Sequence, residues 1–168
     1  MLLYKDMAQI QSKEELEKWH AKSDPWGYES NADDAKRKEL ILSLLGKYER
    51  AIDIGAGDGW ITKDLPSDTI HAIEISDNAA SRFPDNVTRV NEPQGKYDLV
   101  ITTGTLYMQY DRERILGWIR ECSTGNVLIA GIKEWLPELP KPDKYLEFKY
   151  REYTQSIYFY ATHPQHWP

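Results

Sequence analysis

Residues 51–60, Ala-Ile-Asp-Ile-Gly-Ala-Gly-Asp-Gly-Trp, constrain the fold of this chain more than any other stretch. An apolar, β-prone run leads into three glycines at alternate positions, Gly55, Gly57 and Gly59. Glycine allows the backbone to adopt positive φ and lets a ligand approach closely. A helix that begins after such a turn presents unpaired N–H groups to an acceptor. The stretch therefore predicts a buried strand, a ligand-binding loop and a helix start.

The spacing of the glycines separates two kinds of nucleotide site. A dinucleotide loop has the pattern Gly-x-Gly-x-x-Gly, whose third glycine lets the helix pack closely on the strand. Here Trp60 stands at that third position, and Asp53 precedes the first glycine by two residues. An acidic residue there suits a ligand with positive charge and amine donors rather than a pyrophosphate. No Gly-x-x-x-x-Gly-Lys-Ser/Thr sequence occurs, so a P-loop is not supported.

A second feature supports ligand binding. Residues 70–75, Ile-His-Ala-Ile-Glu-Ile, form another strand-like run, and Glu74 lies 19 residues beyond Gly55. An acid about 20 residues past the first glycine, at the end of the second strand, is placed to accept the hydroxyl groups of a ribose. Taken alone, Glu74 could be a solvated carboxylate and the glycines a turn that binds nothing. Together the two features favour a nucleoside-containing ligand.

Length and composition limit the class of protein. A chain of 168 residues has the size of one domain and can fold without disulfides or metals. Its single cysteine, Cys122, excludes an intrachain disulfide and fits a reducing compartment. The first residues lack a basic region followed by an apolar core, and no apolar run reaches the length of a membrane span. We therefore expect a cytoplasmic protein without a membrane partner.

The charge pattern argues against nucleic acid and metal ligands. The formal net charge is −6, whereas nucleic-acid binders usually present a basic face. The basic cluster at residues 36–38 is flanked by acidic residues and is interpreted as a solvated helix face. His163 and His166 are three residues apart, but a proline lies between them and no carboxylate is adjacent, so we expect a surface tail and no metal site.

Local patterns predict the order of elements. Ser12 and Glu15 form a capping box that opens a helix through about His20. The turn at 24–28, Asp-Pro-Trp-Gly-Tyr, carries two aromatic residues that are expected to cover either the core or a ligand. A second helix is expected from Asp33 or Asp34 to Leu45.

Strands and helices then alternate. The expected strands are 50–54, 70–75, 87–90, 97–103 and 127–131, and the expected helices are 60–65, 78–82 and 112–122. In the last helix we expect Ile115, Trp118 and Ile119 to face inward. The alternation predicts an α/β fold with a parallel sheet, right-handed crossovers and helices on both faces. After a proline-rich loop, the aromatic runs 145–153 and 156–161, separated by Thr154-Gln155, predict an antiparallel hairpin.

From about residue 24 to residue 131 the chain resembles small-molecule class I S-adenosylmethionine-dependent methyltransferases. Within them, the Asp-Pro-Trp-Gly turn followed by Arg37-Lys38, together with Leu106-Tyr107, is similar to the nodulation N-methyltransferase (NodS-like) group. The resemblance implies one Rossmann-like domain over 1–168 whose sheet is mostly parallel with a C-terminal antiparallel hairpin. Its expected parts are N-terminal helices and a lid at 1–46, a cofactor-binding core at 50–131, and a proline loop with the closing hairpin at 132–168.

The resemblance also implies roles for individual residues, with S-adenosyl-L-methionine as the cofactor. Glu74 would bind the ribose hydroxyls, Asn91 would lie near the adenine amine, and Thr102 or Thr103 would line the methionine side. The full set expected to hold the cofactor is Asp53, Gly55, Ala56, Gly57, Gly59, Glu74, Ile75, Asn91, Thr102 and Thr103. The residues expected at the lid or the acceptor are Trp26, Tyr28, Arg37 and Tyr107.

Two departures from related sequences bear on the acceptor. Many relatives carry Ser-Glu before Leu-Tyr, whereas this chain has Thr103-Gly104-Thr105 and so lacks an acid that could orient or deprotonate an acceptor. The Asn/Asp-Pro-Pro-Tyr/Phe motif of nucleic-acid and glutamine methylases is also absent. An amine acceptor needs only to be neutral and in line, but a hydroxyl acceptor usually needs a base. The candidate bases are Tyr107, His163 and Glu134.

These observations predict methyl transfer to nitrogen or oxygen of a small polar acceptor, which the resemblance extends to saccharide-like molecules. One alternative is a cofactor-binding module without transfer activity that acts as a sensor or partner subunit. Another is a nicotinamide-dependent oxidoreductase, against which Trp60 argues. Neither nucleic acid nor membrane is an expected partner, and the sequence leaves the oligomeric state open.

Overall fold

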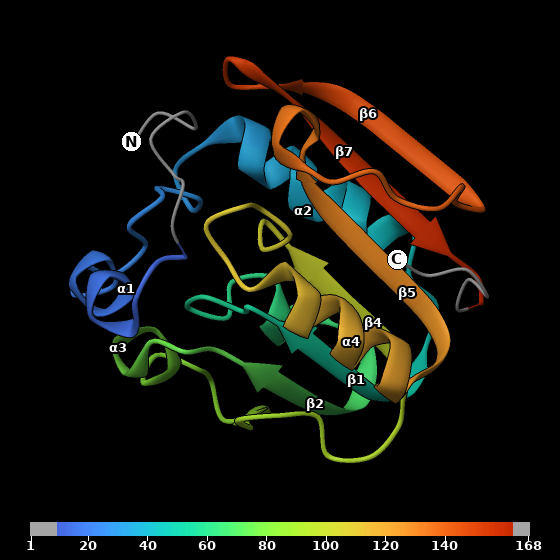
Figure 1. Cartoon of the computed structure of the whole chain (residues 1–168), viewed down its shortest axis with the longest axis horizontal. Helices are drawn as coiled ribbons and strands as arrows, with labels where there is room; N and C mark the ends of the chain where they lie inside the picture. Colours follow the sequence, from blue (N-terminus) through green and yellow to red (C-terminus); the bar gives the residue numbers. More distant parts are fainter. Residues whose placement is uncertain (1–9, 163–168) are drawn as a thin grey trace.

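The structure of the protein is a computed structural model that describes residues 10–162. Its centre is a seven-stranded sheet of order β3-β2-β1-β4-β5-β7-β6 (Figure 1). The strands are β1 Tyr48–Ile54, β2 Ser67–Ile73, β3 Val87–Arg89, β4 Tyr97–Thr103, β5 Ser123–Ile132, β6 Lys144–Tyr150 and β7 Tyr153–Tyr160. Strands β1 to β5 pair in parallel, and β7 pairs antiparallel with β5 and β6. The predicted α/β fold with a closing hairpin is confirmed.

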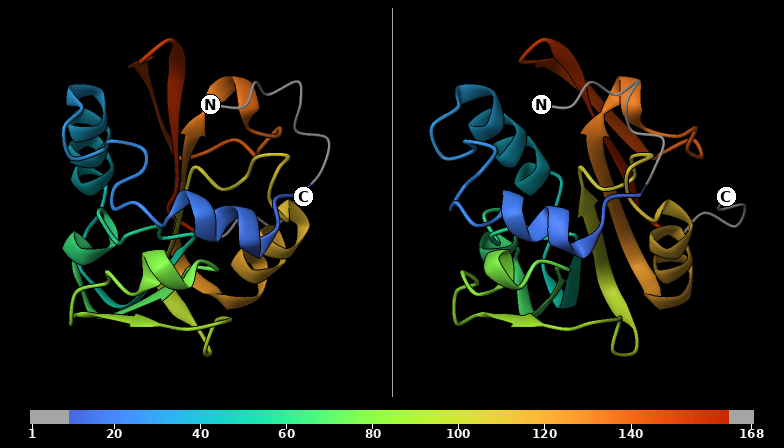
Figure 2. Two further views of the ribbon diagram at one scale, coloured as in Figure 1. Left: turned by 90° about the vertical axis from the view of Figure 1, so that its left-hand side faces the viewer. Right: turned by 60° about the vertical axis from the view of Figure 1, so that its left-hand side comes forward.

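Helices cover both faces of the sheet. They are α1 Lys13–Trp19, α2 Ala32–Ser43, α3 Asp77–Ala80 and α4 Arg112–Cys122, with single 3-10 turns at Thr62–Asp64 and Lys133–Trp135. Figure 2 shows α2 and α4 on opposite sides of the sheet. None of the helices within residues 10–162 is long and apolar enough to cross a membrane.

The core is split between the two faces because successive side chains of a strand point in opposite directions. In β4, Leu99 and Ile101 join the cluster under α2, whereas Val100 joins the cluster under α4. Ile41 anchors α2 and Ile119 anchors α4, and both are fully buried. The central strands β1, β4 and β5 are therefore largely buried on both sides, whereas β6 at the edge of the sheet exposes side chains such as Glu147 and Lys149.

The N-terminal elements begin and end close to the predicted positions. Ser12 and Glu15 form the expected capping box of α1. The second helix begins earlier than predicted, because the side chain of Asn31 accepts hydrogen bonds from the N–H groups of Asp33 and Asp34 and serves as the N-cap. In place of the helix expected at 60–65 there is one 3-10 turn.

Two further predictions need correction. The hairpin turn lies at Arg151-Glu152 rather than at Thr154-Gln155, because Tyr150 pairs with Tyr153 and Gln155 lies within β7. Arg151 adopts a φ of 53°, which allows so short a connection. In α4, Ile119 is buried as expected, together with Leu116 and Cys122, but Ile115 and Trp118 are only half-buried and line a cavity.

Candidate active site

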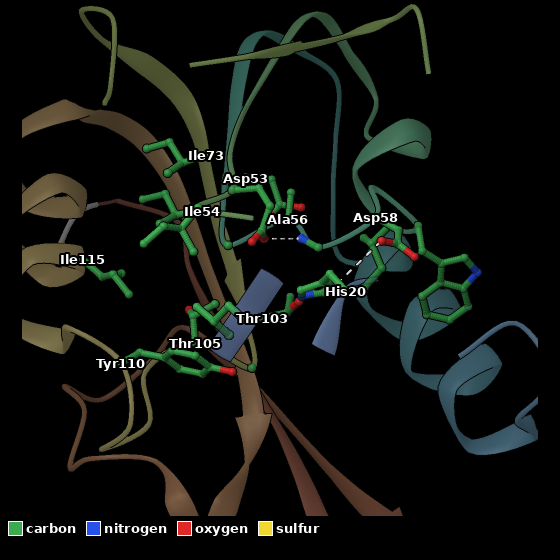
Figure 3. Close-up of a pocket in the computed structure, with 18 of the residues that line it drawn as sticks. His20, Asp53, Ile54, Ala56, Asp58, Ile73, Thr103, Thr105, Tyr110 and Ile115 are labelled. Carbon is green, nitrogen blue, oxygen red and sulfur yellow. Dashed lines mark hydrogen bonds and ion pairs between the residues drawn. The ribbon is translucent and has the colours of Figure 1, made fainter. Parts of the chain in front are cut away.

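A cavity of about 450 Å³ opens at the carboxyl ends of β1, β2 and β4 (Figure 3). Strand order reverses between β1 and β4, since β2 and β3 lie on one side of β1 and β5 on the other. Ligands of open α/β sheets bind at such a switch point. The glycine loop, the end of β2, the turn at 24–28 and the beginning of α4 all contribute to the walls. We call this space the first cavity.

The glycine loop is a tight turn in which Gly55, Gly57 and Gly59 have φ values of 79°, 59° and 83°. A side chain at Gly55 would also lie 2.2 Å from the methyl carbon of Thr105, so this position tolerates only glycine. A Cβ added to Gly57 would meet no atom within 4 Å, because that part of the loop faces open space. The predicted turn is confirmed.

The hydrogen bonds of the loop correct one expectation. The N–H groups of Gly55 and Ala56 donate to the carbonyl of Ile73 at 2.8 and 3.1 Å. The N–H of Gly57 donates to Oε2 of Glu74 at 2.8 Å, and that of Gly59 donates to the carbonyl of Ala56. These N–H groups are therefore not free for an anion, because β2 and the turn itself already use them. Such a loop is unsuited to a pyrophosphate.

Glu74 follows the end of β2 directly and is 8% exposed. Its carboxylate is oriented by two backbone N–H groups, since Gly57 donates to Oε2 and Ser76 donates to Oε1 at 3.0 Å. Two carboxylate oxygens offer about four acceptor positions, so lone pairs remain on the side that lines the cavity. A fixed carboxylate of this kind can accept hydrogen bonds from a pair of neighbouring hydroxyl groups.

Asp53 lies in β1, just before its last residue, and is 2% exposed. The hydroxyl of Thr62 donates to its Oδ2 at 2.7 Å, whereas Oδ1 has no hydrogen-bond partner. Burial raises the pKa of Asp53 to about 7; the Thr62 hydrogen bond acts against this shift and the negative charge of Glu74 adds to it. A buried carboxyl with an unpaired oxygen beside a cavity is suited to a positively charged ligand.

The other residues predicted for the cofactor divide into two groups. Those that line the first cavity are Asp53, Gly55, Ala56, Gly57, Glu74, Ile75, Asn91 and Thr103. Thr102 lies beneath it and is 1% exposed, with its hydroxyl donating to the carbonyl of Ile54 at 2.7 Å and contacting the hydroxyl of Thr105. Gly59 packs against Phe83 rather than lining the cavity. Because side chains alternate along β4, only one of its two terminal threonines can face the cavity.

Asp58, between two of the glycines, connects the loop to the N-terminal segment. Its Oδ2 accepts the N–H of Asp24 at 2.7 Å, and its Oδ1 accepts Nη1 of Arg82 at 3.0 Å. His20, which is 6% exposed, places Nδ1 3.8 Å from Oδ1 of Asp58 (Figure 3). The lid turn at 24–28 therefore rests directly on the glycine loop. His20 and Asp58 could not be predicted from the sequence, because this contact joins segments 38 residues apart.

Arg37 of α2 is 5% exposed and reaches the cavity from the side of the lid. Its Nε donates to Oδ1 of Asp34 at 3.2 Å, and its guanidinium lies 4.7 Å from the ring centre of Tyr28 and 5.7 Å from that of Trp60. Nη2 has no hydrogen-bond partner. A buried guanidinium with an unused donor is suited to an anionic group of a ligand.

A second cavity, of about 90 Å³, adjoins the first. The residues that line both cavities are Trp26, Tyr28, Arg37, Gly104 and Tyr110. Gly104 has a φ of 69°, which explains why this position holds a glycine rather than an acidic residue. Within the second cavity the oxygen of Tyr107 accepts the N–H of Ile132 at 2.7 Å.

The candidate bases are poorly placed or lie elsewhere. Burial raises the pKa of Tyr107, so its phenol keeps its proton at neutral pH and is a weak proton acceptor. Glu134 lines neither cavity, and its carboxylate accepts the N–H of Thr154 at 3.3 Å. His163 lies outside the described residues. Between residues 10 and 162, no three His, Cys, Asp or Glu side chains form a group that could hold a metal ion.

Comparison with known proteins agrees with this geometry. A family model described as a methyltransferase domain matches residues 26–167. No curated protein matches the chain.

Solved structures share the fold at low sequence identity. The N-methyltransferase NodS from Bradyrhizobium japonicum WM9, solved with S-adenosyl-L-homocysteine, is 14% identical with a TM-score of 0.75, over 90% of this chain and 98% of that chain. Magnesium protoporphyrin IX methyltransferase from Synechocystis PCC 6803, solved with S-adenosylmethionine, is 12% identical with a TM-score of 0.66. The match covers 92% of this chain and 98% of that chain. DhpI, solved in complex with S-adenosylhomocysteine, is 12% identical with a TM-score of 0.59, and the match covers 90% of this chain and 94% of that chain.

Proposed function

The chain belongs to the class I S-adenosylmethionine-dependent methyltransferases, and on this premise we propose that it methylates a nitrogen or oxygen atom of a small polar acceptor. One observation carries the proposal. The cavity at the switch point holds a carboxylate fixed by backbone N–H groups, an unpaired oxygen of Asp53 and an unpaired Nη2 of Arg37. S-adenosylmethionine presents a ribose, a positively charged sulfonium and ammonium, and a carboxylate. The fixed carboxylate matches the ribose hydroxyls, the oxygen of Asp53 matches the positive charges, and Nη2 of Arg37 matches the carboxylate.

The assignment of residues follows from this complementarity. Glu74 accepts the ribose hydroxyls with the lone pairs that Gly57 and Ser76 leave unused. Oδ1 of Asp53 faces the positively charged end of the cofactor. Arg37, which the sequence suggested for the acceptor or the lid, binds the cofactor carboxylate instead, because its buried Nη2 otherwise has no partner. Asn91 and Ile75 contribute to the adenine end of the same cavity.

When bound, the cofactor supplies a methyl group on a sulfonium that is intrinsically reactive. The protein contributes alignment of the acceptor and exclusion of water. Trp26 and Tyr28 serve as a lid for this purpose, since both line the two cavities. Two hydrogen bonds fix the lid. The N–H of Asp24 donates to the carboxylate of Asp58 on one side, and Nη2 of Arg151 donates to the carbonyl of Trp26 at 2.9 Å on the other.

The acceptor enters beside Gly104, where the two cavities meet. A nitrogen acceptor reacts there as a neutral amine, without help from a base. An oxygen acceptor reacts when its proton has already been lost, because Tyr107 is a weak proton acceptor. A saccharide-like molecule is one candidate among the small polar acceptors that this proposal covers.

Calorimetric titration with S-adenosylmethionine and S-adenosylhomocysteine tests the proposal. We expect both to bind, and we expect Glu74→Gln to weaken binding roughly 10- to 100-fold, since a hydrogen bond to a charged group contributes about 1.5–3 kcal/mol. The matched control is Glu49→Gln, which changes an exposed carboxylate of β1 outside both cavities. Absence of heat and of any thermal shift at high ligand concentration would refute the proposal. Detection of a methylated product by mass spectrometry separates an enzyme from a module that only binds the cofactor.

A further inference from the structure

The second cavity has walls made largely of aromatic rings. The ring of Tyr107 lies 5.4 Å from that of Trp135 at an interplanar angle of 87°, and Trp135 lies 4.9 Å from Tyr153. Tyr110 stacks on Tyr107 with ring centres 6.5 Å apart. Its volume is about a fifth of that of the first cavity. Aromatic walls of this kind favour a small, flat ligand, because offset and edge-to-face contacts between rings are stabilising.

The charges around this cavity are positive. Among the described residues that line it there are two arginines, Arg37 and Arg151, and neither an aspartate nor a glutamate. Asp34, a carboxylate behind the wall, is fully buried and already occupied. Its Oδ1 accepts from Nε of Arg37 and from the hydroxyl of Tyr150 at 2.6 Å, and its Oδ2 accepts from Nη2 of Arg151 at 2.7 Å. In the protein without ligand, these two guanidinium groups and Asp34 together carry an excess of one positive charge.

The polar groups that line the cavity are mostly hydrogen-bond donors. Burial raises the pKa of Tyr28, Tyr107 and Tyr110, so all three phenols keep their protons at neutral pH. The charge that Tyr28 would carry also raises the pKa of the other two. Protonated phenols next to a guanidinium form an environment that stabilises an anion and disfavours an ammonium.

One acceptor in the cavity has no partner. The side-chain oxygen Oε1 of Gln109, a residue that is only 6% exposed, makes no hydrogen bond. Leaving a buried polar atom unpaired costs about 1–3 kcal/mol. A ligand that carries an O–H or N–H group on its ring would satisfy this atom.

We propose that the second cavity is the acceptor subsite and that it takes a small aromatic acceptor whose reacting atom is an anionic oxygen, a phenolate or an aryl carboxylate. This inference rests on the proposed methyltransferase function and narrows its acceptor. The cofactor strengthens the selection, because its sulfonium keeps a positive charge after its ammonium has paired with Asp53 and its carboxylate with Arg37. An anionic acceptor also explains how the site works without a carboxylate base beside Gly104.

The reaction balances without a proton transfer. A lone pair of the acceptor oxygen attacks the methyl carbon, and an oxygen–carbon bond forms. The carbon–sulfur bond breaks, and its electron pair stays on sulfur. The acceptor loses its negative charge and the sulfonium its positive charge, so a neutral ether or ester and a thioether result. Opposite charges are neutralised during the step, which a water-poor cavity favours.

A matched set of acceptors tests the inference. The wild-type protein, saturated with S-adenosylhomocysteine, is titrated with benzoate, 4-nitrophenol, 4-hydroxybenzoate, benzylamine and glucosamine near pH 8. We expect the three oxygen compounds to bind at least tenfold more tightly than the two amines, and 4-hydroxybenzoate to bind more tightly than benzoate because its second substituent can reach Gln109. With S-adenosylmethionine, mass spectrometry then shows whether 4-nitrophenol gives a methyl ether or benzoate a methyl ester, which distinguishes a phenolate from a carboxylate acceptor.

Three variants separate binding from folding. Tyr110→Phe keeps the ring but removes a donor, and we expect it to weaken binding of the oxygen compounds roughly tenfold. Gln109→Leu removes the unpaired oxygen, and we expect it to abolish the preference for 4-hydroxybenzoate over benzoate. Tyr158→Phe, on β7 outside both cavities, is the control and should change neither.

The possible outcomes separate this inference from the proposed function. Tighter binding of benzylamine or glucosamine, or no preference among the compounds, would overturn the inference while leaving the methyltransferase function intact. Failure to bind S-adenosylhomocysteine at all would overturn the function and the inference with it.

Discussion

Asp53 offers the sharpest test of the electrostatics of the site. In the folded protein without ligand its pKa is raised to about 7, mainly by burial, from an ordinary value of 3.8. Below pH 3.8 the carboxyl is protonated in both the folded and the unfolded chain, and its contribution to stability is then fully present. Between that pH and about 7 only the folded chain keeps the proton, so the free energy of unfolding falls as the pH rises. Above about pH 7 the loss is complete.

The size of this loss follows from the shift. At about 1.4 kcal/mol per pKa unit, the shift corresponds to about 4 kcal/mol between pH 4 and pH 8. Asp53→Asn has nearly the same shape, can still accept the hydrogen bond from Thr62 and cannot ionise. We expect the variant and the wild type to be equally stable near pH 4. At pH 8 the variant should be more stable by up to about 4 kcal/mol.

The affinity for the cofactor should rise with pH, whereas the free energy of unfolding falls. A positive charge next to Asp53 favours its ionised form, so the wild type must release a proton when it binds below pH 7. We expect the affinity for S-adenosylmethionine to rise roughly tenfold between pH 6 and pH 8 and to level off above that. The Asp53→Asn variant should bind more weakly at pH 8 and should show almost no dependence on pH.

Urea denaturation from pH 4 to pH 8.5 measures the first effect, and calorimetric titration over pH 6–8.5 measures the second. Asp68→Asn, which changes an exposed aspartate at the other end of β2, is the control and should alter neither. The reasoning fails if Asp53→Asn is less stable than the wild type at pH 8. It also fails if the variant keeps the pH dependence of cofactor affinity.

Three further changes test other parts of the site. Gly55→Ala places a methyl group 2.2 Å from Thr105 at a φ of 79°, and urea denaturation should show a loss of about 2 kcal/mol or more, with cofactor binding abolished. Asp58→Ala removes the acceptor for the N–H of Asp24, so hydrogen exchange at residues 24–28 should accelerate and cofactor affinity should fall. Arg37→Met should weaken binding of S-adenosylmethionine at least tenfold, because the cofactor carboxylate loses its partner. It should leave the affinity for decarboxylated S-adenosylmethionine unchanged, and calorimetric titration with the two ligands measures both effects.

Local patterns in the sequence were sufficient to predict much of the fold. The capping box at Ser12, the glycine turn and the alternation of strands and helices each depend on residues within a few positions of one another. The helix 112–122 was predicted to the residue, because its cap at Asp111 and its apolar spacing are both local. The hairpin turn was misplaced because Arg151 adopts positive φ, which its sequence neighbours do not indicate.

The geometry of the site depended more on contacts between distant segments. The pairing of Gly55 and Ala56 with Ile73 cannot be read from the loop alone, since it requires β2 to lie alongside. The second cavity combines the lid, the segment after β4 and the β6–β7 turn, which the chain brings together only in the folded state. For the same reason the unpaired oxygens of Asp53 and Gln109 had no signal in the sequence.

A crystal structure of the protein with S-adenosylhomocysteine tests the account most directly. We predict that both ribose hydroxyls lie within hydrogen-bond distance of Glu74, that the ligand ammonium lies on the side of Asp53, and that the ligand carboxylate pairs with Nη2 of Arg37. A ligand bound outside the first cavity would contradict the central claim. So would a ligand in that cavity whose ribose makes no contact with Glu74.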